Sequence, residues 1–180
     1  MTGLRLVCAL LFLLPVACSR GNVGQKPAAA EQEDEALMDD EAIPRAPWDA
    51  DSYVKRGDGH AERGEYEKAI ADYQEAMRLD PGHAEAHDSL AWLLATCPAD
   101  GVRDGKRAVE LATKACELSE WEDAEHVSTL AAAHAECGNF KEAVKWQTKA
   151  IEIGFEEDDD MESAREQLKL YQQRQPYRAE

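Results

Sequence analysis

The sequence predicts an all-α protein, an α-α superhelix (solenoid) of repeated helix-turn-helix units. Composition is the first observation, because 44 % of the 180 residues are hydrophobic and the helix-favouring residues Ala and Leu supply much of that share. Apolar residues also recur at helical spacing, as in Leu90, Leu93 and Leu94. The third observation is an internal repeat, in which residues 64–79 (GEYEKAIADYQEAMRL) align with 138–153 (GNFKEAVKWQTKAIEI).

Residues 1–18 (MTGLRLVCALLFLLPVAC) have the pattern of a secretory signal peptide. Arg5 is their only charged residue, and an apolar stretch and small residues follow it. The ending resembles a bacterial lipoprotein signal, although Pro15 stands where that family usually has Leu. The resemblance implies cleavage after Ala17, lipidation of Cys18 and an exported chain that is held in the cell envelope only by its acyl chains. A soluble periplasmic or secreted product, or a cytoplasmic protein, is the alternative.

The composition of residues 19–49 predicts an acidic, disordered tether. Seven acids and no base lie between Glu31 and Glu41. A segment of this composition cannot bury enough apolar surface to offset the entropy lost on ordering. We therefore expect a solvated spacer.

The repeated part resembles the tetratricopeptide repeat (TPR), a unit of two helices. Gly64, Ala69 and Ala76 of the first copy correspond to glycine and alanines at 138, 143 and 150, and residues 107–118 form a partial third copy. Tyr53, Gly57 and Pro81 also take slots of the family pattern. We expect TPR 1 at 50–83, TPR 2 at 84–123 with an insertion in its turn, and TPR 3 at 124–157. The sequence of these repeats is also similar to that of repeat proteins of planctomycete-like bacteria.

Breakers and caps separate the expected helices. Gly64, Pro98, Gly138 and Gly154 fall between the apolar stretches. Asn139, with Glu142 three residues on, resembles a capping box.

A final helix at 158–175 is expected to cap the stack, because its apolar residues share one helical face. The acids before it favour a helix N-terminus and lack the spacing of a calcium loop. Residues 176–180 are left as a tail.

Charge and motifs exclude several function classes. The net charge of −17 argues against nucleic-acid binding, which needs a cationic face. No phosphate-binding glycine loop or nucleophile motif is present, so we expect no enzyme activity and no cofactor. His83 and His87, four residues apart, offer an alternative function as an accessory ligand- or metal-binding domain, although spacing places no third ligand beside them. Cys97 and Cys137 are expected to fill space as small apolar residues, and a disulfide among Cys97, Cys116 and Cys137 stays open.

The family resemblance implies that the first helix of each repeat lines a concave groove for another protein. The expected groove residues are Lys55, Asp58, Glu62, Glu85, Asp88, Ser89, Trp92, Thr96, Glu125, Ser128 and Thr129. Acids dominate this set, which disfavours a partner's C-terminal carboxylate and favours a basic or apolar-plus-basic segment. Trp92 is the candidate anchor, although it could instead pack between helices.

Overall fold

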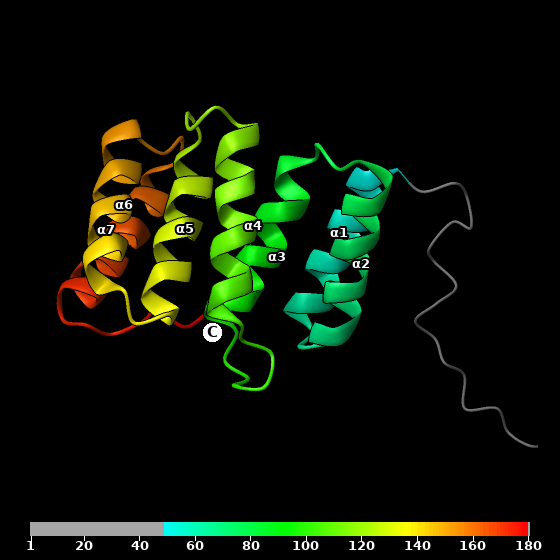
Figure 1. Ribbon diagram of the computed structural model, residues 1–180, viewed down its shortest axis with the longest axis horizontal. Helices are drawn as coiled ribbons and strands as arrows, with labels where there is room; N and C mark the ends of the chain where they lie inside the picture. Colours follow the sequence, from blue (N-terminus) through cyan, green and yellow to red (C-terminus); the bar gives the residue numbers. More distant parts are fainter. Residues whose placement is uncertain (1–48, 180) are drawn as a thin grey trace, which may run out of the picture. The chain divides into compact units, whose positions relative to one another are not determined.

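The computed structural model describes residues 49–179, and this part consists of helices and turns without a strand. It confirms the predicted all-α class (Figure 1). The helices are α1 (Ala50–Glu62), α2 (Tyr66–Leu79), α3 (Ala84–Thr96), α4 (Gly105–Leu118), α5 (Ala124–Glu136), α6 (Phe140–Ile153) and α7 (Asp158–Gln172). The predicted signal peptide (1–18), with Cys18, and the predicted tether up to residue 48 lie outside the described residues. None of the helices described is long and apolar enough to cross a membrane.

The helices pack as three successive pairs followed by α7. Each helix contacts the next one along the chain, and α1, α3 and α5 also contact one another in sequence. We call α1, α3 and α5 the inner row, and α2, α4 and α6 the outer row. Contacts between neighbouring members of the inner row, without comparable contacts in the outer row, are what a curved stack requires.

Short polar caps and two glycines define the helix ends. The side chains of Asp49, His83, Asp104 and Asp123 accept backbone N–H groups at the starts of α1, α3, α4 and α5. Gly64 and Gly138 take φ of 73° and 75°, which explains why glycine recurs at this turn. The capping box expected at Asn139 is wrong, because this residue precedes α6 without a side-chain capping bond.

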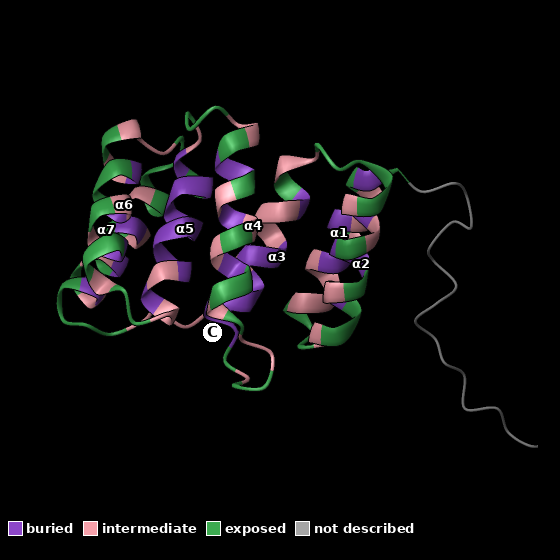
Figure 2. Cartoon of the chain, viewed as in Figure 1, coloured by how far each residue is buried: buried purple, intermediate pink, exposed green. Residues whose placement is uncertain are grey.

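Alanine lets the helices approach closely. Figure 2 shows buried residues on every helix, and many of them are small. The alanines of the repeat pattern in the outer row are fully buried, at positions Ala69, Ala76, Ala108, Ala115, Ala143 and Ala150. Larger side chains such as Leu90, Val127 and Leu130 fill the space between the two rows.

Candidate functional site

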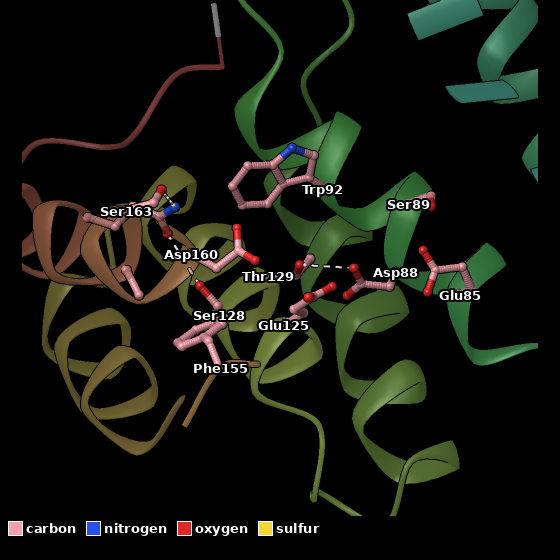
Figure 3. A pocket seen from close by; sticks show the side chains of 12 residues that line it. Glu85, Asp88, Ser89, Trp92, Glu125, Ser128, Thr129, Phe155, Asp160 and Ser163 are labelled. Carbon is pink, nitrogen blue, oxygen red and sulfur yellow. Dashed lines mark hydrogen bonds between the residues drawn. The ribbon is translucent and has the colours of Figure 1, made fainter. Parts of the chain in front are cut away.

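A cavity of about 300 Å³ lies between α3, α5 and α7 (Figure 3). We call it the acidic cavity, because four carboxylates and no Lys, Arg or His side chain line it. Its lining residues are Glu85, Asp88, Ser89, Trp92, Glu125, Ser128, Thr129, Phe155, Asp160, Ser163, Ala164 and Gln167. Seven of the eleven predicted groove residues are among them, all from α3 and α5.

Asp88 is the most unusual group in the cavity. The Thr129 hydroxyl donates a hydrogen bond to Asp88 Oδ2 over 3.2 Å, whereas Oδ1 is buried without a hydrogen-bond partner. Burial raises the pKa of Asp88 well above its usual range, and the charges of Glu85, Asp123 and Glu125 add to this effect while the Thr129 bond opposes it. Asp88 is thus a carboxyl group with an unused acceptor atom.

Glu125 faces the same acidic surroundings. Its pKa is raised by partial burial and then by the neighbouring charges of Asp123, Asp160 and Glu85. Figure 3 shows the Asp160 carboxylate beside Trp92 and the Glu125 side chain near Thr129 and Asp88. A cation entering here would meet several carboxylates that repel one another in its absence.

A polar network builds the floor of the cavity. The Ser128 hydroxyl lies 3.1 Å from Gln147 Oε1 and 3.3 Å from Gln167 Oε1, and Gln147 Nε2 donates to the Ala164 carbonyl over 3.2 Å. These bonds join α5, α6 and α7. Sequence reasoning treated α7 only as a cap and missed this wall. The sequence feature that could have indicated this wall is Gln147, a polar residue at the repeat position where Phe is usual.

Trp92 contacts the C-terminal tail as well as the cavity. Its ring and that of Tyr177 are tilted by 38°, with centroids 5.7 Å apart. Thr96, predicted to face the groove, has a buried side chain whose hydroxyl donates to the Trp92 carbonyl. Its own carbonyl accepts the Ala179 N–H over 3.0 Å. At Thr96 the backbone carbonyl, and not the side chain, therefore makes the contact with the C-terminal tail.

None of the predicted groove residues of α1 lines the acidic cavity. Lys55 and Asp58 line a smaller hollow of about 260 Å³ together with His83 and Glu85. Asp58 accepts a hydrogen bond from the Tyr73 hydroxyl over 2.8 Å, which engages it in the core of the first pair. Glu62 is exposed at the end of α1, outside both cavities.

The structure gives His83 and His87 separate partners. His83 Nε2 lies 2.7 Å from Asp51 Oδ1, and its Nδ1 accepts the Ala86 N–H at the start of α3. His87 Nε2 donates to the Pro81 carbonyl over 3.2 Å. Between residues 49 and 179, no three His, Cys, Asp or Glu side chains are grouped so that they could hold a metal ion.

The cysteines among the described residues are free. Cys97 and Cys116 are buried and Cys137 is half-buried. Burial, with the charges of Asp88 and Asp123, raises the pKa of the Cys116 thiol to about 12. The thiol is therefore inert at neutral pH and acts as a small apolar residue.

Comparisons with known proteins find the predicted repeat in two segments. Residues 57–95 match a family model described as TPR repeat, and residues 128–153 match one described as Tetratricopeptide repeat. These two segments are similar to tetratricopeptide repeats. The first spans the end of α1, all of α2 and nearly all of α3, and the second spans most of α5 and all of α6. No curated protein matches the sequence.

A solved structure shares the fold. It is the first TPR of Spaghetti (RPAP3) bound to the HSP90 peptide SRMEEVD, and it has a TM-score of 0.57 and 19 % sequence identity. The match covers 69 % of this chain and 90 % of the other. Together with the helix order, it shows a TPR superhelix.

Proposed function

We propose that this chain is a non-catalytic adaptor that binds a basic segment of another protein in the groove of its inner row. The observation that carries the proposal is the acidic cavity, in which Glu85, Asp88, Glu125 and Asp160 gather without a base. Trp92 stands at its edge as an aromatic anchor. Peptide binding along the inner row is the use that tetratricopeptide repeats suggest.

The chemistry of the cavity favours a cationic side chain of the partner. A Lys ammonium or Arg guanidinium would donate hydrogen bonds to the carboxylates of Glu85, Glu125 and Asp160, which line the same cavity. The face of Trp92 suits the alkyl stem of such a residue or a stacked guanidinium. The negative field of the groove would also accelerate the encounter, because opposite charges steer association.

The structural relative binds a peptide of the opposite character. Three of the last four residues of SRMEEVD are acids. The carboxylates of Glu85, Glu125 and Asp160 would repel such a peptide, since they are already crowded without a counter-charge. We therefore carry over from the relative only that this fold holds a peptide, and we propose the opposite charge for the partner.

The proposed location is the cell envelope, with a lipid anchor at Cys18. Its support is the N-terminal sequence alone, which combines a short apolar stretch with a Cys after Ala17. Mass spectrometry of the native N-terminus tests the proposal. A diacylated or triacylated Cys18 is expected, and an intact Met1 or an unmodified mature end would rule it out.

Capture of partners from cross-linked envelope extract tests the adaptor function. The baits are the whole chain, its Trp92→Ala and Glu125→Gln variants, and Glu152→Gln as a matched control on the exposed face of α6. We expect the partner to be recovered with wild type and Glu152→Gln. Glu125→Gln should lower recovery about tenfold, equivalent to about 1.4 kcal/mol of binding free energy.

Salt provides the second readout of the same experiment. Recovery should fall as the ionic strength rises, because screening weakens attraction between exposed charges. Equal recovery with all four baits, or recovery that is insensitive to salt, would place the interface outside the acidic cavity and contradict the proposal.

A further inference from the structure

The C-terminal tail lies across the ends of the inner-row helices. After α7 the chain turns at Arg174, which has a φ of 60°, and residues 175–179 continue without helical structure. Figure 1 shows this red segment leaving α7 and running past α5 to the point marked C. Its contacts with α3 and α5 bring it to the inner row.

Three consecutive tail residues each make a different kind of contact. The Tyr177 ring packs against Trp92, Arg178 Nη2 lies 2.6 Å from Glu136 Oε2, and the Ala179 N–H donates to the Thr96 carbonyl. The last bond satisfies one of the carbonyls that a helix leaves unpaired at its C-terminal end. The cation of Arg178 also suits the negative ends of α3 and α5.

Glu136, the partner of Arg178, is held in place independently of the tail. Arg103 Nε donates to Glu136 Oε1 over 3.0 Å, and Arg103 Nη1 donates to the Cys97 carbonyl over 2.6 Å. The inserted turn of the second repeat thus fixes Glu136, and Oε2 faces Arg178. Trp92, Thr96 and Glu136 form what we call the tail site.

We infer that the tail site binds an extended partner segment in which an aromatic residue is followed by Arg, and that Tyr177 and Arg178 of this chain occupy it in the absence of the partner. The inference rests on the proposed function and names the partner's sequence chemistry. Trp92 belongs to both the tail site and the acidic cavity. A partner segment that replaces the tail can therefore extend directly toward Asp88 and Glu125.

A partner is favoured over the tail of a second copy. A tethered tail has an effective concentration in the millimolar range, so an identical tail from another molecule competes poorly. A partner gains an advantage only through contacts that the tail does not make, and the acidic cavity supplies them. Arg178 is the part of the tail most open to competition, because it remains one-third exposed and its pairing with Glu136 is open to solvent screening.

A peptide competition experiment on the whole chain tests the inference. The probe is a fluorescein-labelled peptide of sequence QPYRAE, the last six residues of the chain, measured by fluorescence anisotropy. The tail-released variant combines Tyr177→Ser with Arg178→Glu. Arg165→Glu, at an exposed position on α7, is the matched control for the change of charge.

We expect the tail-released variant to bind the peptide about tenfold more tightly than wild type or Arg165→Glu, as a site that is about nine-tenths occupied by its own tail requires. Adding Trp92→Ala to the released variant should abolish binding, whereas adding Glu136→Gln, or replacing the probe by the peptide QPYEAE, should weaken it several-fold. Circular dichroism confirms that each variant keeps its helices.

Several outcomes overturn the inference. These are equal binding to wild type and released variant, binding that survives Trp92→Ala, and no binding to the released variant at millimolar peptide. A wild-type dimer in light scattering that the released variant does not form would assign the site to a second copy. If the peptide does not bind but partner capture still depends on Glu125, only this inference is contradicted. If the peptide binds but partner capture does not depend on Glu125, the proposed function is contradicted instead.

Discussion

At the scale of single residues, Asp88 shows how a binding site and a stable fold make opposite demands. A buried carboxylate with one hydrogen bond is costly, and three neighbouring acids increase the cost. The folded chain therefore holds a proton on Asp88 at a higher pH than the unfolded chain does. The stability of the fold falls as the pH rises from about 3.9, the ordinary pKa of Asp, through the raised value.

The Asp88→Asn variant should be more stable than wild type at pH 7. We expect a gain of about 1 kcal/mol in the free energy of unfolding, or about 4 °C in Tm, because Asn keeps an acceptor for Thr129 and carries no charge. The loss of stability between pH 4 and pH 7 should become shallower, though not vanish, since the pKa of Glu125 is raised too.

Thermal unfolding at several pH values measures both effects. Glu110→Gln, at an exposed position of α4, is the control and should change stability by less than about 0.5 kcal/mol. A lower Tm for Asp88→Asn at pH 7, or an unchanged pH dependence, would show that the buried carboxyl is not a source of strain. The same variant should lose affinity for a basic partner.

At the scale of elements, the first helix pair depends on one close contact. A Cβ placed on Gly57 would lie 2.6 Å from Tyr73 Cε1. Tyr73 cannot move away easily, since it is buried and its hydroxyl is bonded to Asp58. Gly59, on the same helix, has only Arg63 Nη1 near its would-be Cβ, at 3.5 Å.

Two alanine substitutions in α1 should therefore have opposite effects. Gly57→Ala should lower the free energy of unfolding by about 1 to 2 kcal/mol, because overpacking outweighs the gain in helix propensity. Gly59→Ala should raise it by about 0.5 to 1 kcal/mol, because only the propensity changes. Urea unfolding measures both, and a stabilising Gly57→Ala would show that Tyr73 can be displaced at little cost.

The elements were largely predictable from sequence, and the exceptions have physical reasons. Helical spacing and recurring Gly64 and Gly138 indicated the pairs, because each repeat must solve the same packing problem. Asn139 was mispredicted as a capping side chain, since a capping pattern does not fix the rotamer of the residue. The contacts of the tail were not predictable at all, because Tyr177 and Arg178 follow Pro176 without any periodicity.

At the scale of the whole described part, the site combines repeated and non-repeated elements. The repeat pattern predicted the cavity residues of α3 and α5, because equivalent slots of an inner row face the same way. It could not predict Asp160 or Gln167, which belong to α7 and have no counterpart in another repeat. One wall of the groove therefore depends on how firmly the last helix is attached.

Tyr171→Ala should loosen that wall while the first repeat stays folded. Tyr171 is fully buried on α7, and replacing such an aromatic residue with Ala typically costs about 3 to 5 kcal/mol. Because each unit of a stack is stabilised mainly by its neighbours, the loss should stay near the C-terminal end. Hydrogen exchange should then lose protection in α6, α7 and the tail, and keep it in α1 and α2.

The Gly57→Ala variant provides the mirror-image control, with protection lost in α1 and α2 and kept in α6 and α7. Uniform loss in both variants would show instead that the helices unfold as one cooperative block. If the loss is local, the Tyr171→Ala variant should also bind a basic partner more weakly, because Asp160 leaves the acidic cavity with α7 and the tail no longer reaches Trp92. Attachment of the last helix would then control how the groove is presented.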